Sequence, residues 1–587
     1  MKSKMTIMKS VASFAMAFAA FSSVNAQTNL GADCGCPAVG SRPSVNISSL
    51  PGYVAADANS GTLTTGATLT CANTYVLDTR TFVPAGQTIT IAPGSLIKGE
   101  TGSASAATAL VISRGADIIA DGTQDCPIVF TALADDLSGT YPISNIGQWG
   151  GVVVLGTATN NLTFAANGPF TAGSGNGRVC VGDGLGVVEG FAADVAGLRY
   201  GALQNAGTPV AGEVVTPFND ADNSGIMRYV SIRHSGANLN VGNEINGLTL
   251  ASVGSGTTIE HIEIVACADD NIELFGGNVN LKYITTIFGN DDALDWDQGY
   301  IGNIQYFFSM KTDLDSSPDS DNGIEADSDD QASNNLRRSH PIVRNATFVG
   351  NAKTVNSADN SGMAGFWAKD LTEGEVYNSV FAFFRQGFNM VKSISGNRSF
   401  AAGGQAWHNW TNIPGPASAT NGNGSQSLKV VCNTFVGCTF PLTIGASASA
   451  GSSTSAAAEV TSGADFTQFT VTDMNTIVAG NTLPGFDYSF DINTANNGIV
   501  TQSDLIPNPA LSTSGCPTST NGFFENAPFR GAFDSDPSRN WLSNWSYSQV
   551  LGNTNGVQAC PADLNQDGSI NVNDFLLFAP AWGTDCN

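Results

Sequence analysis

Positively charged residues are scarce in this sequence of 587 residues. Lys and Arg total 24, Asp and Glu total 50, and the formal net charge is −26. So acidic a chain repels the phosphate backbone, and nucleic acid is therefore excluded as a partner. The four histidines lack metal-type spacing, and no Gly-rich phosphate loop, nucleophile elbow or Cys-X-X-Cys motif is present. Nucleotide-binding, zinc and Ser or Cys nucleophile chemistry have no support in the sequence.

Long apolar runs are also missing, except at the N-terminus. There, Lys2, Lys4 and Lys9 accompany the apolar stretch "VASFAMAFAAF", and "VNA" ends at Ala26. This order is typical of a secretory signal peptide, which we predict over residues 1–26. No other run reaches the roughly 18 apolar residues that span a bilayer, so no transmembrane segment is expected. The sequence predicts an exported protein, secreted or at the outer cell surface, with a net charge of 21 − 50 = −29 once three lysines are removed.

Amphipathic helical patterns are absent, whereas short alternating strands and 66 glycines are frequent. Placing residues 259–275 over residues 281–297 matches Ile262 with Ile284 and Glu273 with Asp295, an offset of 22 residues. Apolar and polar residues alternate within each half, as in strands with one buried face. A coil of this size cannot bury its own apolar face, but stacked coils can. The repeat therefore predicts an all-β solenoid, a parallel β-helix.

The repeat also predicts a core and a division into domains. The expected inward ladder consists of Leu248, Ile272, Leu294, Ile324, Phe366 and Phe388. The expected segments are an N-terminal cap over residues 27–69, the solenoid over residues 70–545, and a small C-terminal module over residues 558–587. Loops inserted into the solenoid are expected at residues 197–225, 313–335, 400–428 and 445–463.

One coil carries a recognisable family pattern. Residues 118–131 read "IIADGTQDCPIVFT", which fits "I-x-A-x-G-T" followed by "P-I-x-F-T". In this coil and in its overall organisation, from about residue 70 to about residue 500, the sequence resembles the right-handed parallel β-helix proteins of the pectate-lyase-like superfamily. The resemblance implies a right-handed parallel β-helix, and it does not by itself imply a reaction.

Carboxylates gather in outward columns of this predicted solenoid. Glu273, Asp295 and Glu325 share one column, and Asp297 and Asp327 share the next. Adjacent coils lie about 4.8 Å apart, where like charges facing each other destabilise a sheet. A bound hard cation such as calcium, a raised pKa on one acid, or solvation of splayed side chains would relieve the repulsion. We predict that these five acids form a metal or ligand site.

The same face offers candidates for catalysis. These candidates are Glu273, Asp295, Glu325 and Lys369. Two carboxylates about 5 Å apart match a retaining glycosidase pair, whereas calcium with a base from Lys369, Arg337 or Arg338 would suit a lyase. The polygalacturonase-like set includes a "GHG" motif that this sequence lacks, which counts against hydrolysis.

Three tryptophans offer flat surfaces for a sugar ring. They are Trp367 beside the acids and Trp407 and Trp410 in the tract "QAWHNWTN". Aromatic faces stack on pyranose rings, but the same side chains also pack against the flank of a solenoid. Both interpretations stay open for each tryptophan.

A residue pattern typical of calcium-binding loops lies near the end of the sequence. The stretch "DLNQDGSINVND", Asp563–Asp574, places oxygen-bearing side chains at loop positions 1, 3, 5, 9 and 12, with Gly568 at position 6 for the sharp turn. This spacing predicts an EF-hand-like loop–helix module that binds calcium.

Asp at position 12, Ile570 at position 8 and the following "FLLFAPAW" make this loop resemble a type I dockerin repeat. Carried over by position, the resemblance implies the calcium ligands Asp563, Asn565, Asp567, Ser569, Asn571 and Asp574. Dockerins have two repeats and only one is visible, so the tail serves either a cohesin-like partner or surface attachment. Cys560 and Cys586 bracket the module and suggest a disulfide.

Taken together, these patterns predict a calcium-binding β-helix protein at the cell surface or outside the cell, and they favour binding of a polysaccharide or another surface component over catalysis. One alternative is a polysaccharide lyase or glycoside hydrolase acting at the acidic columns. A second alternative is a structural or adhesive surface protein without a small ligand.

Overall fold

The fold is that of a computed structural model of the chain. The residues it describes are 34–137, 141–162, 179–182, 184–188, 196–202, 217–240, 243–311, 322–328, 337–350, 364–369, 372–391, 428–445, 458–479, 513–534, 536 and 539–550.

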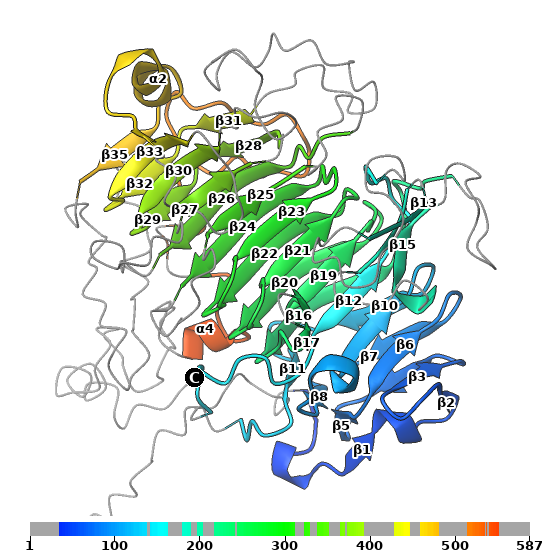
Figure 1. The fold of residues 1–587 in the computed structure, drawn as a ribbon. Helices are drawn as coiled ribbons and strands as arrows, with labels where there is room; N and C mark the ends of the chain where they lie inside the picture. Colours follow the sequence, from blue (N-terminus) through cyan, green and yellow to red (C-terminus); the bar gives the residue numbers. More distant parts are fainter. Residues whose placement is uncertain are drawn as a thin grey trace, which may run out of the picture.

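Two long sheets run side by side along the described part of the molecule (Figure 1). The first contains β2 (Tyr53–Ala55), β3 (Ser60–Leu63), β6 (Arg80–Val83), β9 (Ala109–Ile112), β12 (Val152–Leu155), β19 (Leu248–Ala251), β21 (Ile272–Phe275), β23 (Leu294–Asp297), β25 (Ile324–Ala326), β27 (Ala364–Ala368), β30 (Gln386–Val391), β33 (Phe440–Gly445) and β34 (Ala458–Glu459). The second contains β1 (Ser44–Asn46), β4 (Ala67–Leu69), β5 (Thr74–Leu77), β7 (Thr88–Ile91), β8 (Leu96–Gly99), β10 (Asp117–Asp121), β11 (Ile128–Ala132), β16 (Gly225–Arg233), β20 (Thr258–Val265), β22 (Asn280–Ile287), β24 (Asn303–Met310), β26 (Ile342–Val349), β28 (Gly374–Tyr377), β29 (Val380–Ala382), β31 (Leu428–Val431), β32 (Thr434–Val436) and β35 (Thr476–Val478).

Strands from successive turns of the chain pair in parallel in both sheets, as β21 does with β23 and β20 does with β22. Within these two sheets, the described strands pair antiparallel where β2 meets β3 and where β33 meets β34, at the two ends of the first sheet. This arrangement confirms the predicted all-β parallel β-helix. The register also agrees with the offset read from the sequence, because Ile262 pairs with Ile284 and Glu273 pairs with Asp295.

The long strands of the second sheet bend in the middle, which gives each coil a corner. Tyr229, His261, Tyr283 and Tyr306 occupy this corner in successive coils, each with φ between 51° and 59°. Non-glycine residues rarely adopt this left-handed conformation. The four rings stack with centroid distances of 4.2, 4.5 and 5.1 Å, and this packing helps to hold the strained corner.

The core is a set of apolar ladders along the helix axis. The predicted ladder is present and each member is fully buried: Leu248, Ile272, Leu294, Ile324, Phe366 and Phe388. A second ladder stacks Phe307, Phe348, Phe381 and Phe435 at centroid distances of 5.2 to 5.4 Å. Phe469, from the π-helical turn η7 (Gln468–Thr472) that follows helix α2 (Gly463–Thr467), packs against Phe435 and covers this end of the core.

The N-terminal end is held by disulfides. Cys34 pairs with Cys126 and Cys36 pairs with Cys71. Short 3₁₀ turns lie at η1 (Val39–Ser41), η2 (Ile47–Ser49) and η3 (Ala104–Ala106). Because β1 pairs in parallel with β5 and β3 with β6, coil-like pairing already starts within the segment expected to be a cap.

An antiparallel insertion covers the outer face of the first sheet on its N-terminal coils. It contains β13 (Val179–Gly182), β14 (Leu185–Val187), the 3₁₀ turn η4 (Ala196–Leu198) and β15 (Arg199–Gly201). A small pair, β17 (Asn238–Asn240) with β18 (Asn243–Glu244), lies nearby in sequence. Tyr200 stacks on Phe275, and Leu162 and Val187 belong to the same apolar cluster as Val153. The outer face of these coils therefore carries a covered apolar cluster that reaches Phe275.

Residues 513–534 and 539–550, here named the C-terminal strap, run lengthwise over the flank of the solenoid. The disulfide Cys432–Cys516 fixes one end. At the other end Glu263 accepts hydrogen bonds from the backbone N–H groups of Tyr547 and Ser548, at the start of helix α4 (Tyr547–Val550). Figure 1 shows α4 beside β16 and β20. The strap lies within the range predicted as solenoid up to residue 545, but its described residues form no parallel strand.

Among the described residues, none of the helices is both long enough and apolar enough to cross a bilayer.

Candidate cation site

Successive coils of the first sheet build the acidic columns as predicted. Thr249 pairs with Glu273, Glu273 with Asp295, and Asp295 with Glu325. Trp367 follows Glu325 in the next coil. Their neighbours Ile272, Leu294 and Ile324 point into the core, so the alternation of a strand turns these side chains outward. We name the acids on this face, Glu273, Asp295, Asp297, Glu325 and Asp327, the acidic ladder.

The acidic ladder is largely shielded from solvent. Glu273 is 7% exposed, Asp295 9%, Asp297 7% and Asp327 9%. These values argue against acids that splay into water, which was one of the three ways to relieve their repulsion. Buried like charges need a counter-charge or a proton.

Lys369 supplies a counter-charge to one half of the ladder. Its Nζ forms ion pairs with Glu325 and with Asp327, the latter at 3.3 Å. The same ammonium lies 4.5 Å from the centroid of the Trp367 ring. The Trp367 ring, for which sugar stacking and packing against the solenoid were both left open, therefore already has a cation over it.

The other half of the ladder has a different surrounding. One carboxylate oxygen from each of Asp270, Glu273 and Asp295 lies within 4.8 Å of the other two. The side-chain amide of Asn246 donates a hydrogen bond to Glu273. Oδ1 of Asp295 is buried and has no hydrogen-bond partner among the protein atoms. Burial raises the pKa of Asp295 well above its usual range, and the charges of Glu325 and Glu273 raise it further.

Asp270 is a residue of the cluster that the sequence did not single out. It also serves a hydrogen-bond ladder along the axis, because its Oδ1 accepts from the backbone N–H of Asp292 at 2.9 Å. Asp292 accepts in the same way from Asn322, and Asn322 from Ala364. The signal was the repeated pair of aspartates at residues 269–270 and 291–292, whose second members turn out to support the backbone of the next coil.

A calcium ion fits this donor set. Calcium prefers carboxylate and carbonyl oxygens at 2.3–2.6 Å, so ligands on opposite sides of one ion lie about 5 Å apart. The oxygens of Asp270, Glu273 and Asp295 all lie within 4.8 Å of one another, which is compatible with that span. The partnerless Oδ1 of Asp295 provides an oxygen that the protein itself does not use. These three residues would hold the ion.

Comparison with known protein families shows to which family the chain belongs. The family described as the pectate-lyase like beta helix domain matches residues 61–411, which is more than half of the chain. The chain belongs to this family. No curated protein and no solved structure gave a match. Family membership makes it a polysaccharide-related β-helix protein, and the match begins at β3, close to the first parallel pairings.

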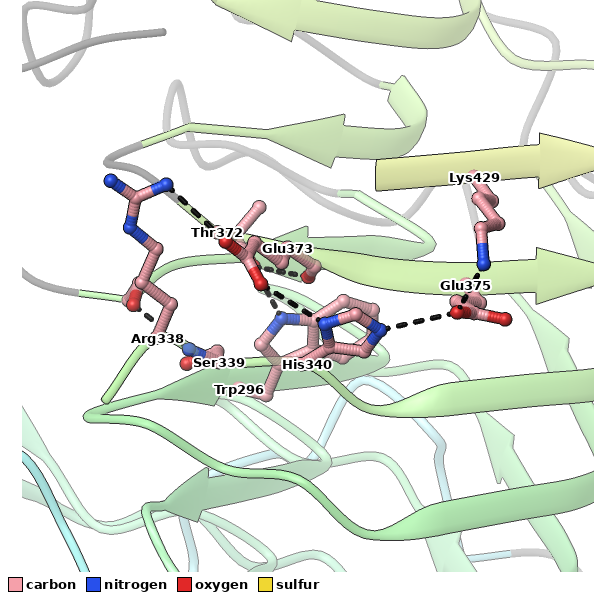
Figure 2. A network of polar contacts seen from close by, with 9 residues as sticks. Trp296, Arg338, Ser339, His340, Thr372, Glu373, Glu375 and Lys429 are labelled. Atoms are coloured by element: carbon pink, nitrogen blue, oxygen red, sulfur yellow. Dashed lines mark hydrogen bonds and ion pairs between the residues drawn. The ribbon is translucent and has the colours of Figure 1, made fainter. Parts of the chain in front are cut away.

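The corner that follows the acidic ladder in this pectate-lyase-like domain holds a charge network (Figure 2). His340 lies between Glu373 and Glu375, with its Nδ1 3.0 Å from Glu373 and its Nε2 3.3 Å from Glu375. Lys429 and Arg338 extend the network on either side. Burial alone would lower the pKa of His340, but the two glutamates outweigh it and raise the pKa to about 9.

The basic residues expected to serve a lyase are engaged in other contacts. Arg338 pairs with Glu373. Arg337 is buried, donates to the carbonyl of Gly277 and lies 3.7 Å from Asp220. Because Lys369 is also ion-paired, each of the three predicted bases near the pectate-lyase-like ladder is held by a partner.

Several predicted residues lie outside the described part of the chain. These are the signal peptide at residues 1–26, Trp407 and Trp410, the calcium loop with Asp563, Asn565, Asp567, Ser569, Asn571 and Asp574, and the pair Cys560 and Cys586. Two further cysteines, Cys267 and Cys438, are free thiols.

Proposed function

We propose that the protein is an exported, calcium-dependent polysaccharide-binding protein of the pectate-lyase-like β-helix family. The observation that carries the proposal is the buried Asp295 carboxylate, which has a partnerless oxygen and shares a cluster with Asp270 and Glu273. A bound calcium ion would supply a positive centre for the oxygen atoms of a sugar. Asn246 orients Glu273 toward this centre through its side-chain amide.

The presence of three disulfides among the described residues supports an extracellular location. Three cross-links, at Cys34–Cys126, Cys36–Cys71 and Cys432–Cys516, suit an oxidising compartment. They agree with the proposed signal peptide over residues 1–26. We further propose that the C-terminal calcium loop, Asp563–Asp574, attaches the protein to a surface or to a cohesin-like partner.

Binding without turnover is favoured over lyase chemistry by the pairing of the bases. A lyase needs a base that can take a proton from the substrate. Arg337, Arg338 and Lys369 each contact a carboxylate instead. Glu273 and Asp295 lie on adjacent coils, as the two carboxylates of a glycosidase would. The test must therefore also detect hydrolysis.

The test is retention of the full-length protein on uronate-containing and neutral polysaccharides, with calcium or with EDTA. Retention that requires calcium and is lost in Asp295→Asn supports the proposal. A matched control is Glu260→Gln, which removes a carboxylate from another column of the solenoid. Retention that is indifferent to both EDTA and Asp295→Asn would overturn it. Release of soluble sugar products would identify an enzyme instead.

A further inference from the structure

The acidic ladder ends where its coil pattern changes. Asp295 and Asp297 are followed in the next coil by Glu325 and Asp327, but the coil after that presents Trp367 and Lys369. An aromatic ring and an ammonium therefore stand where the column would otherwise continue with carboxylates.

Lys369 is placed as a cation within the ladder. Its side chain is 15% exposed, and those of Glu325 and Asp327 are 13% and 12% exposed. Both carboxylates approach the same Nζ from the preceding coil, and the Trp367 ring lies against it on its own strand. Carboxylate oxygens that converge on one ammonium form a preorganised site for positive charge.

We propose that Lys369 is the resident counter-cation of the ladder, which keeps a divalent ion out of the half formed by Glu325 and Asp327. The inference extends the proposed function, in which calcium occupies the half formed by Asp270, Glu273 and Asp295. Lys369 thereby sets the number of ions that the ladder holds and leaves one metal centre to face a ligand.

Charge balance explains why removal of the ammonium would admit an ion. Without Lys369, two largely buried carboxylates would lose the cation on which they converge. Calcium accepts several carboxylate oxygens and carries twice the charge of the ammonium. A second ion would then neutralise the pair at the position that Nζ occupies.

The experiment measures calcium bound per full-length chain by equilibrium dialysis, with calcium chloride as the only probe. Lys369→Met should bind one calcium more than the wild-type protein, and the triple change Lys369→Met, Glu325→Gln, Asp327→Asn should lose that extra ion. Lys429→Met is the matched control, because Lys429 also pairs with a glutamate, Glu375, that keeps His340 and Tyr377 as partners. It should leave the number unchanged.

A folded Lys369→Met protein with the wild-type number of ions would overturn the inference. Asp295→Asn reports separately on the proposed function, since it should remove one ion whether or not Lys369 is present. If Lys369→Met is too unstable for dialysis, its melting temperature with and without calcium is measured instead of the number of bound ions. Calcium should then raise its melting temperature by more than it raises that of the wild-type protein, and an equal increment would overturn the inference.

Discussion

Two outward columns of the same solenoid handle charge in opposite ways. On the second sheet, Asp121, Arg228, Glu260 and Lys282 alternate in sign along successive coils. On the first sheet, Glu273, Asp295 and Glu325 carry the same sign. The strand spacing is about 4.8 Å in both sheets, so geometry alone does not account for the difference.

The alternating column neutralises itself. Arg228 lies 2.7 Å from Asp121 and 3.2 Å from Glu260, and Lys282 pairs with Glu525 of the C-terminal strap at 2.6 Å. In the acidic ladder, Lys369 pairs with Glu325 and Asp327 at one end. A solenoid can therefore balance opposite charges within one column and concentrate like charges in another.

Removal of calcium should have the largest effect, and within the solenoid it should act on the acidic ladder and not on the alternating column. An ion present at about 100 times its dissociation constant stabilises the folded state by about 2.7 kcal/mol. The free energies of unfolding of the wild-type protein in calcium and in EDTA, measured by urea unfolding, should differ by about this amount. Asp563→Asn, which alters the C-terminal loop, should keep the difference; if it vanishes there, the stabilisation belongs to the tail.

The charge on His340 should make the stability of the protein depend on pH, whether or not calcium is bound. The folded-state pKa of about 9 lies above the ordinary value of 6.5, so the stabilisation is complete below pH 6.5 and is lost as pH rises through 9. The free energy of unfolding should fall by about 2 kcal/mol between pH 7 and pH 9.5, measured by urea unfolding in EDTA. His340→Gln should flatten this dependence, and an unchanged slope would contradict the assignment.

Asp295→Asn should change the sign of its effect with calcium. In EDTA the substitution removes a buried carboxyl whose pKa is raised by burial and by the charges of Glu325 and Glu273, so stability should rise by about 1 kcal/mol. With calcium it removes a proposed ligand, so stability should fall by about 1–2 kcal/mol. Thermal unfolding of both states tests the prediction. The same sign under both conditions would argue that no ion binds there.

The smallest effect is expected in the alternating column. Arg228→Met removes two ion pairs whose side chains are about one-third exposed, and such pairs contribute about 0.5–1 kcal/mol. The loss should shrink in high salt and should not depend on calcium. Unfolding at two ionic strengths checks this, and a calcium-dependent loss would erase the contrast between the two columns.

The sequence predicted those features that follow from its period. Glu273 and Asp295 are 22 residues apart, and a regular coil places such residues side by side. The ladder from Leu248 to Phe388 followed from the same alternation. Both depend only on which face of a strand a residue occupies, which the sequence pattern encodes directly.

Other features depend on backbone geometry or on distant contacts. Asp270 joins the candidate site because its side chain lies at a coil corner, where a period of two no longer decides its direction. Tyr229, His261 and Tyr283 adopt positive φ, although Gly and Asn are the usual residues there. The strap contacts residues some 200–400 positions away, and no periodic signal links such segments.

The C-terminal strap has a consequence for the order in which the molecule matures. Its side chains and backbone meet Asn433, Gln305 and Glu263, and Ser543 accepts a hydrogen bond from Gln124, so its contacts reach turns made early and late. The strap follows all of these turns in the chain and can seat only when each is already formed. Docking of the strap onto the solenoid is therefore a late step of folding, which requires the coils between these contacts to be folded first.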